Sequence, residues 1–146
     1  MIRIFYAHPS TESPKQIKED TKRLIELIGE RLESRSGTLP KIAVISGRRD
    51  FQSFYRGDWS DWAKSVVERV DSMTRKRAYA FFIIRTETCG RATANIIQFA
   101  LAKKRQVFWW DGDSTFIRVE KIEVSDPENW SSGFNIIKVP YQLPLF

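Results

Sequence analysis

The sequence predicts a three-layer α/β fold, with helices on both sides of a mostly parallel sheet and a C-terminal β-β appendage. Apolar runs alternate with amphipathic stretches over residues 1–112, as in successive βαβ units. Residues 81–112 read as strand, turn, helix and strand with short connections, so these strands should be parallel. Beyond residue 112 the pattern changes to an alternation typical of half-exposed strands. We expect one domain over residues 1–146, with its core in residues 1–112 and strands and a tail in residues 113–146.

The first strand is expected at residues 2–7, an apolar run. A helix should follow, because Ser13 is a good N-cap, Pro14 suits the first helical position and Gln16 completes a capping box. Residues 34–40 should end this helix. Its apolar stripe has helical spacing and consists of Ile17, Thr21, Leu24, Ile25, Ile28 and Leu32.

The second strand is expected at residues 41–46, and the next helix should begin with Asp58 or Ser60 as its cap. Between them, residues 47–57 form a loop that is bounded by glycines and contains three arginines and three aromatic residues. The apolar positions of the helix are Trp59, Trp62, Ala63, Val66, Val67, Val70 and Met73.

The remaining elements follow from shorter patterns. Residues 81–84 and 106–110 are apolar runs typical of strands buried on both faces. The helix between them should carry Lys103, Lys104 and Arg105 in its last turn, where cations favour the helix dipole. Residues 115–124 and 134–139 complete the predicted strands. The inward side of that helix is expected to consist of Ala92, Ile96, Ile97, Ala100 and Leu101.

Composition limits the classes of protein. The single cysteine excludes an internal disulfide and a cysteine-based metal cluster, and no motif indicates a metal or a cofactor. No apolar run approaches the ~20 residues that span a bilayer, and the N-terminus lacks a signal-peptide core. We therefore expect a cytoplasmic protein without a membrane anchor. The net charge of +6 suggests an anionic partner such as a nucleotide, with nucleic acid as an alternative.

In open α/β sheets the ligand site lies at the carboxyl ends of the strands. Residues 85–91 occupy that edge, where Gly90 would allow close approach of the backbone and the free amides of the next helix would hold an anion. The alternative is that Thr88 caps the helix and Gly90 only turns the chain. The residues expected to bind a ligand here are Tyr6, Ala7, Thr86, Gly90, Arg91, Thr93 and Asn95.

The loop at 47–57 is a second candidate for ligand binding. Arg48 and Arg49 would neutralise phosphates while Phe51 or Tyr55 stacks on a base, and Trp59 follows directly. The alternative is a surface loop whose aromatic side chains pack on the domain, with Trp59 in the core.

The segments Tyr6-Ala7-His8-Pro9, Trp59 to Val70, and Gly90 to Leu101 with the following strand resemble the nucleoside 2-deoxyribosyltransferase family. The resemblance covers roughly the first 112 residues. It implies a Rossmann-like, flavodoxin-like fold, nucleoside binding at the strand ends and assembly into homo-oligomers, for which Trp109-Trp110 is a candidate contact. It also implies catalysis by a glutamate early in the helix that follows Gly90.

The chain departs from this family at that glutamate, because Asn95 and Ile96 occupy the candidate positions. Glu87 is the nearest carboxylate in the sequence and is our candidate nucleophile, since carboxylates form glycosyl esters and stabilise oxocarbenium ions. Asp61 would order a catalytic water, and His8 would act as a base or contact the substrate. For each of these three residues, the alternative is an ordinary surface or loop residue.

Three functional hypotheses follow. The first is a nucleoside- or nucleotide-binding protein that, if it is an enzyme, cleaves or transfers at the N-glycosidic bond. The second is a non-catalytic nucleotide sensor or sequestering protein, which the missing glutamate favours. The third is a basic nucleic-acid-binding accessory protein, for which net charge is the only support.

Overall fold

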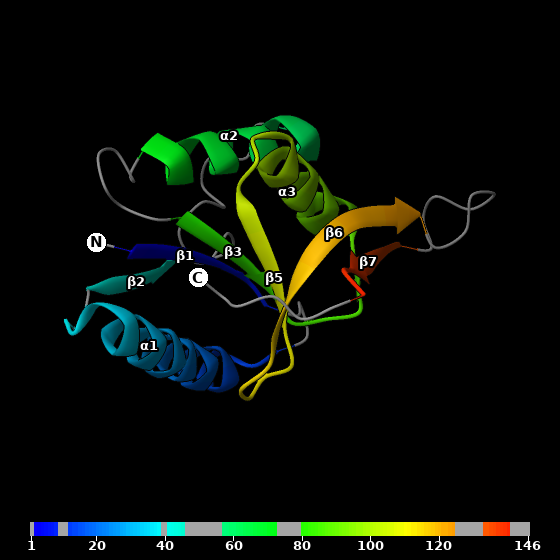
Figure 1. Cartoon of the computed structure of the whole chain (residues 1–146). Coiled ribbons are helices and arrows are strands. Elements are labelled where there is room, and N and C mark those ends of the chain that lie inside the picture. Colours follow the sequence, from blue (N-terminus) through cyan, green and yellow to red (C-terminus); the bar gives the residue numbers. More distant parts are fainter. Residues whose placement is uncertain are drawn as a thin grey trace.

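A computed structural model of the chain describes six segments, namely residues 2–8, 12–38, 41–45, 57–72, 80–124 and 133–140. The side chains at positions 59, 60, 69–72, 80 and 92 are not described. Within these segments the chain forms three helices and a mixed sheet of seven strands (Figure 1). The helices are α1 (Pro14–Ser36), α2 (Trp59–Ser72) and α3 (Arg91–Ala102). The strands are β1 (Ile2–Ala7), β2 (Ile42–Ile45), β3 (Ala80–Ile84), β4 (Thr88–Cys89), β5 (Gln106–Trp110), β6 (Phe116–Val124) and β7 (Phe134–Lys138).

The sheet has the strand order β2-β1-β3-β5-β6-β7-β4. The first four strands in this order are parallel, as predicted for the strands around residues 81–112. The other three pairings are antiparallel, so the C-terminal strands extend the same sheet. The expectation of a mostly parallel sheet therefore holds for the first four strands and not for the sheet as a whole.

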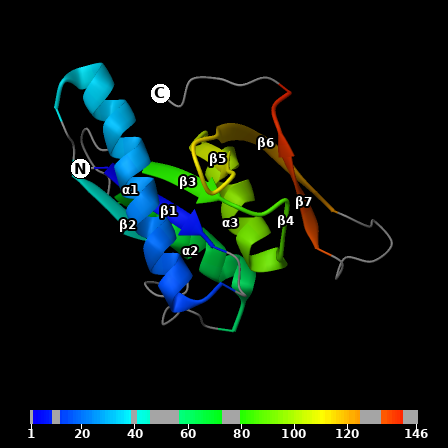
Figure 2. The ribbon, with the colours of Figure 1, turned by 90° about the horizontal axis from the view of Figure 1, so that it is seen from below.

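Apolar side chains cover both faces of the sheet, because residues along each strand point alternately to opposite sides. On one face, Ile4 and Ile83 pack with Leu24 and Ile28 of α1. On the other face, the strands pack against the apolar stripes of α2 and α3. Figures 1 and 2 show α1 on one side of the sheet and the other two helices on the opposite side. The inward residues of α2 that the structure describes are those predicted, namely Trp62, Ala63, Val66 and Val67.

Helix α1 begins as its sequence predicts. The side chain of Ser13 accepts a hydrogen bond from the Gln16 amide at 3.1 Å, with Pro14 in the first position. Half of the predicted capping box is therefore present. The Gln16 side chain, which would complete the box, donates a hydrogen bond to Asp20. The helix ends at Gly37, which has a left-handed conformation with φ of 75°.

Two expectations about the helices need correction. Ile25 was expected on the inward stripe of α1 but is exposed, and Asp20 is buried instead. Helix α3 ends at Ala102, and Lys104 takes a positive φ of 60°. The three cations at positions 103–105 therefore follow the helix and do not lie in its last turn, because the chain must turn there into β5.

None of the helices within the described segments is long and apolar enough to cross a membrane.

We predict that Ser13→Ala lowers the free energy of unfolding by about 1 kcal/mol, since it removes the acceptor for a helix amide. Ser34→Ala is the matched control, because Ser34 is exposed near the end of the same helix and alanine is the better helix former there. Urea denaturation monitored by circular dichroism measures both. Equal effects of the two substitutions would contradict the role of Ser13.

Candidate functional site

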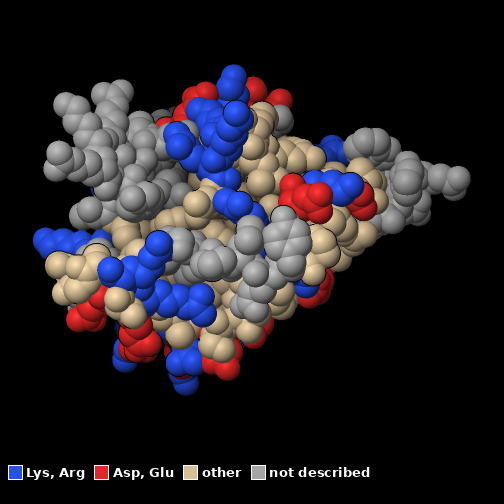
Figure 3. Space-filling view, in the orientation of Figure 1, with Lys and Arg blue, Asp and Glu red and all other residues tan. Residues whose placement is uncertain are grey.

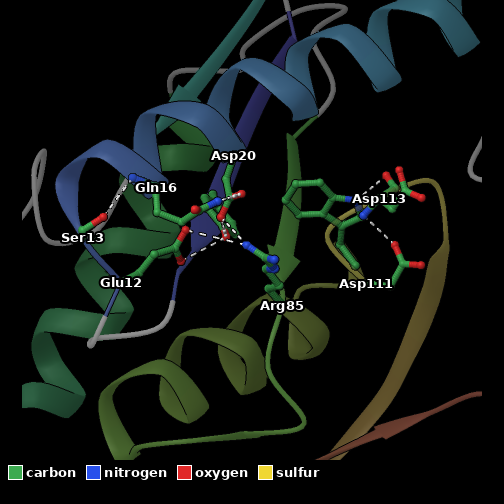
Figure 4. Close-up of polar contacts among 9 residues, drawn as sticks. Glu12, Ser13, Gln16, Asp20, Arg85, Asp111 and Asp113 are labelled. Carbon is green, nitrogen blue, oxygen red and sulfur yellow. Dashed lines mark hydrogen bonds and ion pairs between the residues drawn. The ribbon is translucent and has the colours of Figure 1, made fainter.

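A group of polar side chains meets where β1 and β3 end. The two strands are parallel neighbours, with Ala7 opposite Ile84, so Tyr6 and Arg85 lie close together at the carboxyl edge. Glu12, Gln16 and Asp20 reach the same place from the start of α1 (Figure 4). We call these five residues the Tyr6 cluster.

Asp20 is the centre of the Tyr6 cluster and is only 4% exposed. It accepts hydrogen bonds from the Tyr6 hydroxyl at 2.8 Å, the Arg85 guanidinium at 2.6 Å and the Gln16 side chain at 3.0 Å. Burial acts to raise the pKa of Asp20, but hydrogen bonds with Glu12, Tyr6 and Gln16 and the charge of Arg85 outweigh it. The pKa therefore lies below its ordinary value, and Asp20 is a stable anion.

The pKa of Glu12 is shifted in the opposite direction to that of Asp20, although the Glu12 side chain is also buried, with only 5% exposed. Its Oε1 atom is buried and has no hydrogen-bond partner in the part of the chain that the structure describes. The nearest cation is Arg85, with Nη1 at 3.8 Å from this oxygen. Burial, a hydrogen bond with Asp20 and the negative charge of Asp20 raise the pKa of Glu12 to about 7. Near neutral pH the pair of carboxyl groups therefore holds one proton, which resides on Glu12.

Tyr6 keeps its proton throughout the physiological range. It is 1% exposed, and burial together with the hydrogen bond to Asp20 raises its pKa far above the ordinary value. Its hydroxyl is therefore a permanent donor to Asp20, with Glu12 Oε2 at 3.5 Å as its second neighbour.

The Arg85 side chain is partly open to solvent, since it is 31% exposed. The guanidinium lies 5.6 Å from the centre of the Trp110 ring. On another side it meets Gly112, where a Cβ atom would come within 2.6 Å of Nη2. Gly112 also has φ of 90°, so both backbone conformation and space favour glycine at this position.

The loop after β5 joins α1 to this arrangement. Trp110 donates from Nε1 to the Asp113 carbonyl at 2.9 Å, and Arg23 of α1 pairs with the Asp113 carboxylate. Arg31, which lies further along α1, donates to the Ser114 carbonyl at 2.7 Å. The ends of β1, β3 and β5 are thus held together through α1.

The predicted nucleophile Glu87 lies elsewhere. Its carboxylate is 64% exposed and both oxygens are 3.0 Å from Lys138 Nζ on β7. The Lys138 ammonium in turn lies 3.9 Å from the centre of the Trp109 ring. The Glu87 carbonyl accepts a hydrogen bond from the amide of Ile136. Residues Thr88 and Cys89 form β4, which pairs with β7, so the segment after β3 is bound to the C-terminal hairpin.

The other predicted ligand residues near Gly90 form the start of α3. Gly90 is the N-cap with φ of −78°, and the position of a Cβ atom there is open. The protein itself therefore does not require glycine here, and close approach of a ligand to this backbone stays a prediction. The Thr86 hydroxyl donates to the Thr88 carbonyl at 2.5 Å. Arg91 is exposed, and Thr93 and Asn95 are half-buried.

His8 and Ala7 belong to the end of β1, and the His8 ring lies edge-on to Tyr6 with ring centres 6.0 Å apart. Asp61 is exposed in the first turn of α2, on the helix that packs on the opposite face from Asp20. Trp59 begins that helix, and its side chain is not described. Four predicted ligand residues lie outside the described segments, namely Arg48, Arg49, Phe51 and Tyr55.

Two residues near this edge are structural. Burial raises the pKa of the Cys89 thiol to about 12, so it is not a reactive thiolate at neutral pH. Trp110 is fully buried and stacks on Phe116. Its side chain is therefore not available for the predicted subunit contact.

Sequence reasoning missed Glu12 and Asp20. A signal for Asp20 exists, because it lies three residues after Ile17 and four before Leu24, on the apolar stripe of the helix. A charged residue on such a stripe indicates a buried partner. Glu12 precedes the cap and carries no comparable signal.

The described residues contain no group of three or more His, Cys, Asp or Glu side chains able to hold a metal ion. On the face drawn in Figure 3, Lys and Arg side chains lie in several groups, with uncharged and acidic side chains between them. The described residues on that face therefore do not form a single basic surface of the kind that binds nucleic acid.

In comparisons with known proteins, no protein-family model, no curated protein and no solved structure matches the chain.

We predict that Gly112→Ala destabilises the fold more than Gly37→Ala. Both positions have positive φ, which costs alanine about 1–2 kcal/mol. Only at Gly112 would the new methyl group displace the Arg85 guanidinium, since nothing lies within 4 Å at Gly37. We expect an additional loss of about 1–3 kcal/mol from the broken contact with Asp20, measured by urea denaturation. Equal losses would mean that the guanidinium moves aside without penalty.

We also predict that Glu12→Gln changes how stability depends on pH. The pKa of Glu12 is raised from 4.5 to about 7 in the folded protein, so the folded state holds a proton that the unfolded state has lost in this window. Stability of the wild type should therefore fall as pH rises from about 4.5 to about 7, by at most about 1.4 kcal/mol for each pH unit.

The Glu12→Gln variant should lack this loss and gain stability relative to wild type at higher pH. Glu19→Gln, on the exposed side of the same helix, should follow the wild type. Urea midpoints at pH 5, 6, 7 and 8 provide the measurement. A difference between Glu12→Gln and wild type that is constant with pH would exclude a raised pKa.

Proposed function

We propose that the protein binds a nucleoside or nucleotide at the carboxyl edge between β1 and β3 and cleaves or transfers at its N-glycosidic bond. The observation that carries this proposal is the pair of carboxyl groups at that edge, Glu12 and Asp20, with Arg85 beside them. Neighbouring carboxyl groups whose pKa values are pushed apart supply a proton donor near neutral pH, and breaking an N-glycosidic bond needs a donor to the leaving base.

The proposal includes a Rossmann-like, flavodoxin-like arrangement in three layers. Its support is the parallel order β2-β1-β3-β5 and the presence of helices on both faces. In such folds the ligand binds where the strand order reverses, which is between β1 and β3. Tyr6 and Arg85 end those two strands, and this agrees with the resemblance to nucleoside 2-deoxyribosyltransferases.

The cost of the Tyr6 cluster to stability is a second argument for function. A buried carboxyl group without a full set of partners destabilises a fold when it ionises. Glu12 has such an oxygen, and a glutamine could occupy the position without ionising. Groups of this kind concentrate at functional sites, where a shifted pKa serves the chemistry.

The roles predicted for Glu87, Asp61 and His8 stay predictions. The three residues differ in whether they lie near the Tyr6 cluster. His8 lies beside Tyr6 and can contact a ligand at this edge. Glu87 is paired with Lys138, and Asp61 is on the helix across the sheet. We therefore place the reaction at the Tyr6 cluster.

A non-catalytic nucleotide sensor is the second candidate. The ion pair between Glu87 and Lys138 favours it, because this pair removes the expected carboxylate from the start of α3. A sensor would use the same edge and the same Arg85.

We predict that the protein releases free base from at least one nucleoside or nucleotide. The experiment incubates the protein with a panel of ribo- and deoxyribonucleosides and their monophosphates, with and without a second base, and separates the products by chromatography. A new nucleoside indicates transfer, and free base alone indicates hydrolysis. A thermal-shift screen with the same compounds runs in parallel, since a ligand at 100 times its Kd stabilises by about 2.7 kcal/mol.

The combination of results separates the candidates. A thermal shift without release of base supports the sensor. Neither a shift nor release from any compound would contradict both proposals.

A further inference from the structure

The two carboxyl groups of the Tyr6 cluster have unequal partners. Asp20 accepts from three donors, on Tyr6, Gln16 and Arg85. Glu12 Oε1 is buried with no hydrogen-bond partner among the described residues, and the Arg85 nitrogen at 3.8 Å is already bonded to Asp20. One carboxyl group therefore has three hydrogen-bond donors, and the other has a buried oxygen without a hydrogen-bond partner among the described residues.

Figure 4 shows the direction of these side chains. Glu12 and Asp20 approach Arg85 from the same side, and the guanidinium lies between them and the strand that ends at residue 84. Glu12 immediately precedes the N-cap Ser13, whose hydrogen bond to Gln16 holds the start of α1. This cap and the strand end therefore fix where the Glu12 carboxyl group can lie.

We propose that Glu12 is the residue that gives and takes the proton at the N-glycosidic bond, an inference that rests on the proposed function. Asp20 is a positioning residue that remains ionised and holds the Glu12 proton in place. Tyr6, Gln16 and Arg85 position Asp20 in turn through their hydrogen bonds.

The reaction balances with water as the only other reactant. The Glu12 carboxylic acid gives its proton to the base nitrogen as the bond between C1′ and that nitrogen breaks and its electron pair goes to the base. The water oxygen bonds to C1′, and the water proton returns to the Glu12 carboxylate. In a transfer, a second base takes the place of water and loses its own proton to Glu12.

The neighbours of Glu12 determine the pH at which it works. Among the described residues, the titratable and charged groups that face it are Tyr6 from β1, Asp20 from α1 and Arg85 after β3. Tyr6 remains neutral and Arg85 remains cationic over the working range, so Asp20 supplies the negative charge that holds the proton on Glu12. The His8 ring lies edge-on to the Tyr6 ring, with the ring centres 6.0 Å apart, so its role is tested alongside that of Glu12.

The test is the rate of base release from the best nucleoside of the panel, measured from pH 5 to pH 9. The protonated form of Glu12 is the active one, so the wild-type rate should fall as pH rises through about 7. Glu12→Gln should reduce the rate about 100-fold or more and abolish this step in the pH profile. Glu12→Asp, which retains a carboxyl group, should keep the step at a reduced rate.

Variants of the neighbours distinguish chemistry from structure. Asp20→Asn removes the negative charge that favours the Glu12 proton, so in the folded variant the Glu12 step should move to lower pH. In the His8→Gln variant, the midpoint of the pH step should be the same as in the wild type, even if the rate of base release changes. The Glu19→Gln variant should match the wild type in both rate and pH profile. Circular dichroism establishes that each variant is folded.

Each outcome decides the inference. Base release that persists in Glu12→Gln with an unchanged pH profile overturns it and leaves the proposed function standing. A step that disappears in His8→Gln assigns the proton to His8 and also overturns it. No base release by the wild type from any compound overturns the proposed reaction and this assignment together.

Discussion

The contact of one guanidinium group with two neighbouring buried carboxyl groups is the interaction on which the rest of this site depends. Arg85 can compensate one full negative charge, and it does so for Asp20 at 2.6 Å. A second ionised carboxyl group in the same low-dielectric surroundings would lack compensation. Glu12 therefore keeps its proton to an unusually high pH, with a pKa of about 7. The asymmetry between these chemically similar groups arises from which of them the cation and the neutral donors contact.

The fold holds this arrangement from three directions. Parallel pairing of β1 and β3 brings Tyr6 and Arg85 together, and the capped start of α1 brings Asp20 over the end of β1. The loop after β5 supplies the third side, because Gly112 leaves room for the guanidinium and Trp110 covers it. The same loop is bound to α1 through Asp113. The same contacts therefore hold the site and pack α1 on the sheet. A substitution that disturbs the site should also weaken the packing of α1.

The sequence was sufficient for the elements whose signal is local. The strands at residues 2–7 and 106–110 were predicted with their observed bounds, because each is a short run of mainly apolar residues between polar segments. The strand β4 has only two residues, and it exists because the distant strand β7 pairs with it. No local sequence pattern predicts such a strand. Asp20 on an apolar stripe was a readable signal, whereas its meeting with Arg85 depends on the register of two parallel strands. Glu87 was selected by its place in the sequence, and its contact with Lys138 depends on the C-terminal hairpin.

The most direct test of the central claim is a carbon-13 NMR titration of the side-chain carboxyl groups of Glu12 and Asp20 in the wild-type protein. If the pair holds one proton, which resides on Glu12, the Glu12 carbon should titrate near pH 7, and the Asp20 carbon should report the same step while remaining ionised at neutral pH. Assignment by Glu12→Gln and Asp20→Asn identifies the two signals. A Glu12 carboxyl group that titrates near 4.5, with Asp20 insensitive to it, would contradict the proton on Glu12 and remove the chemical basis for the site.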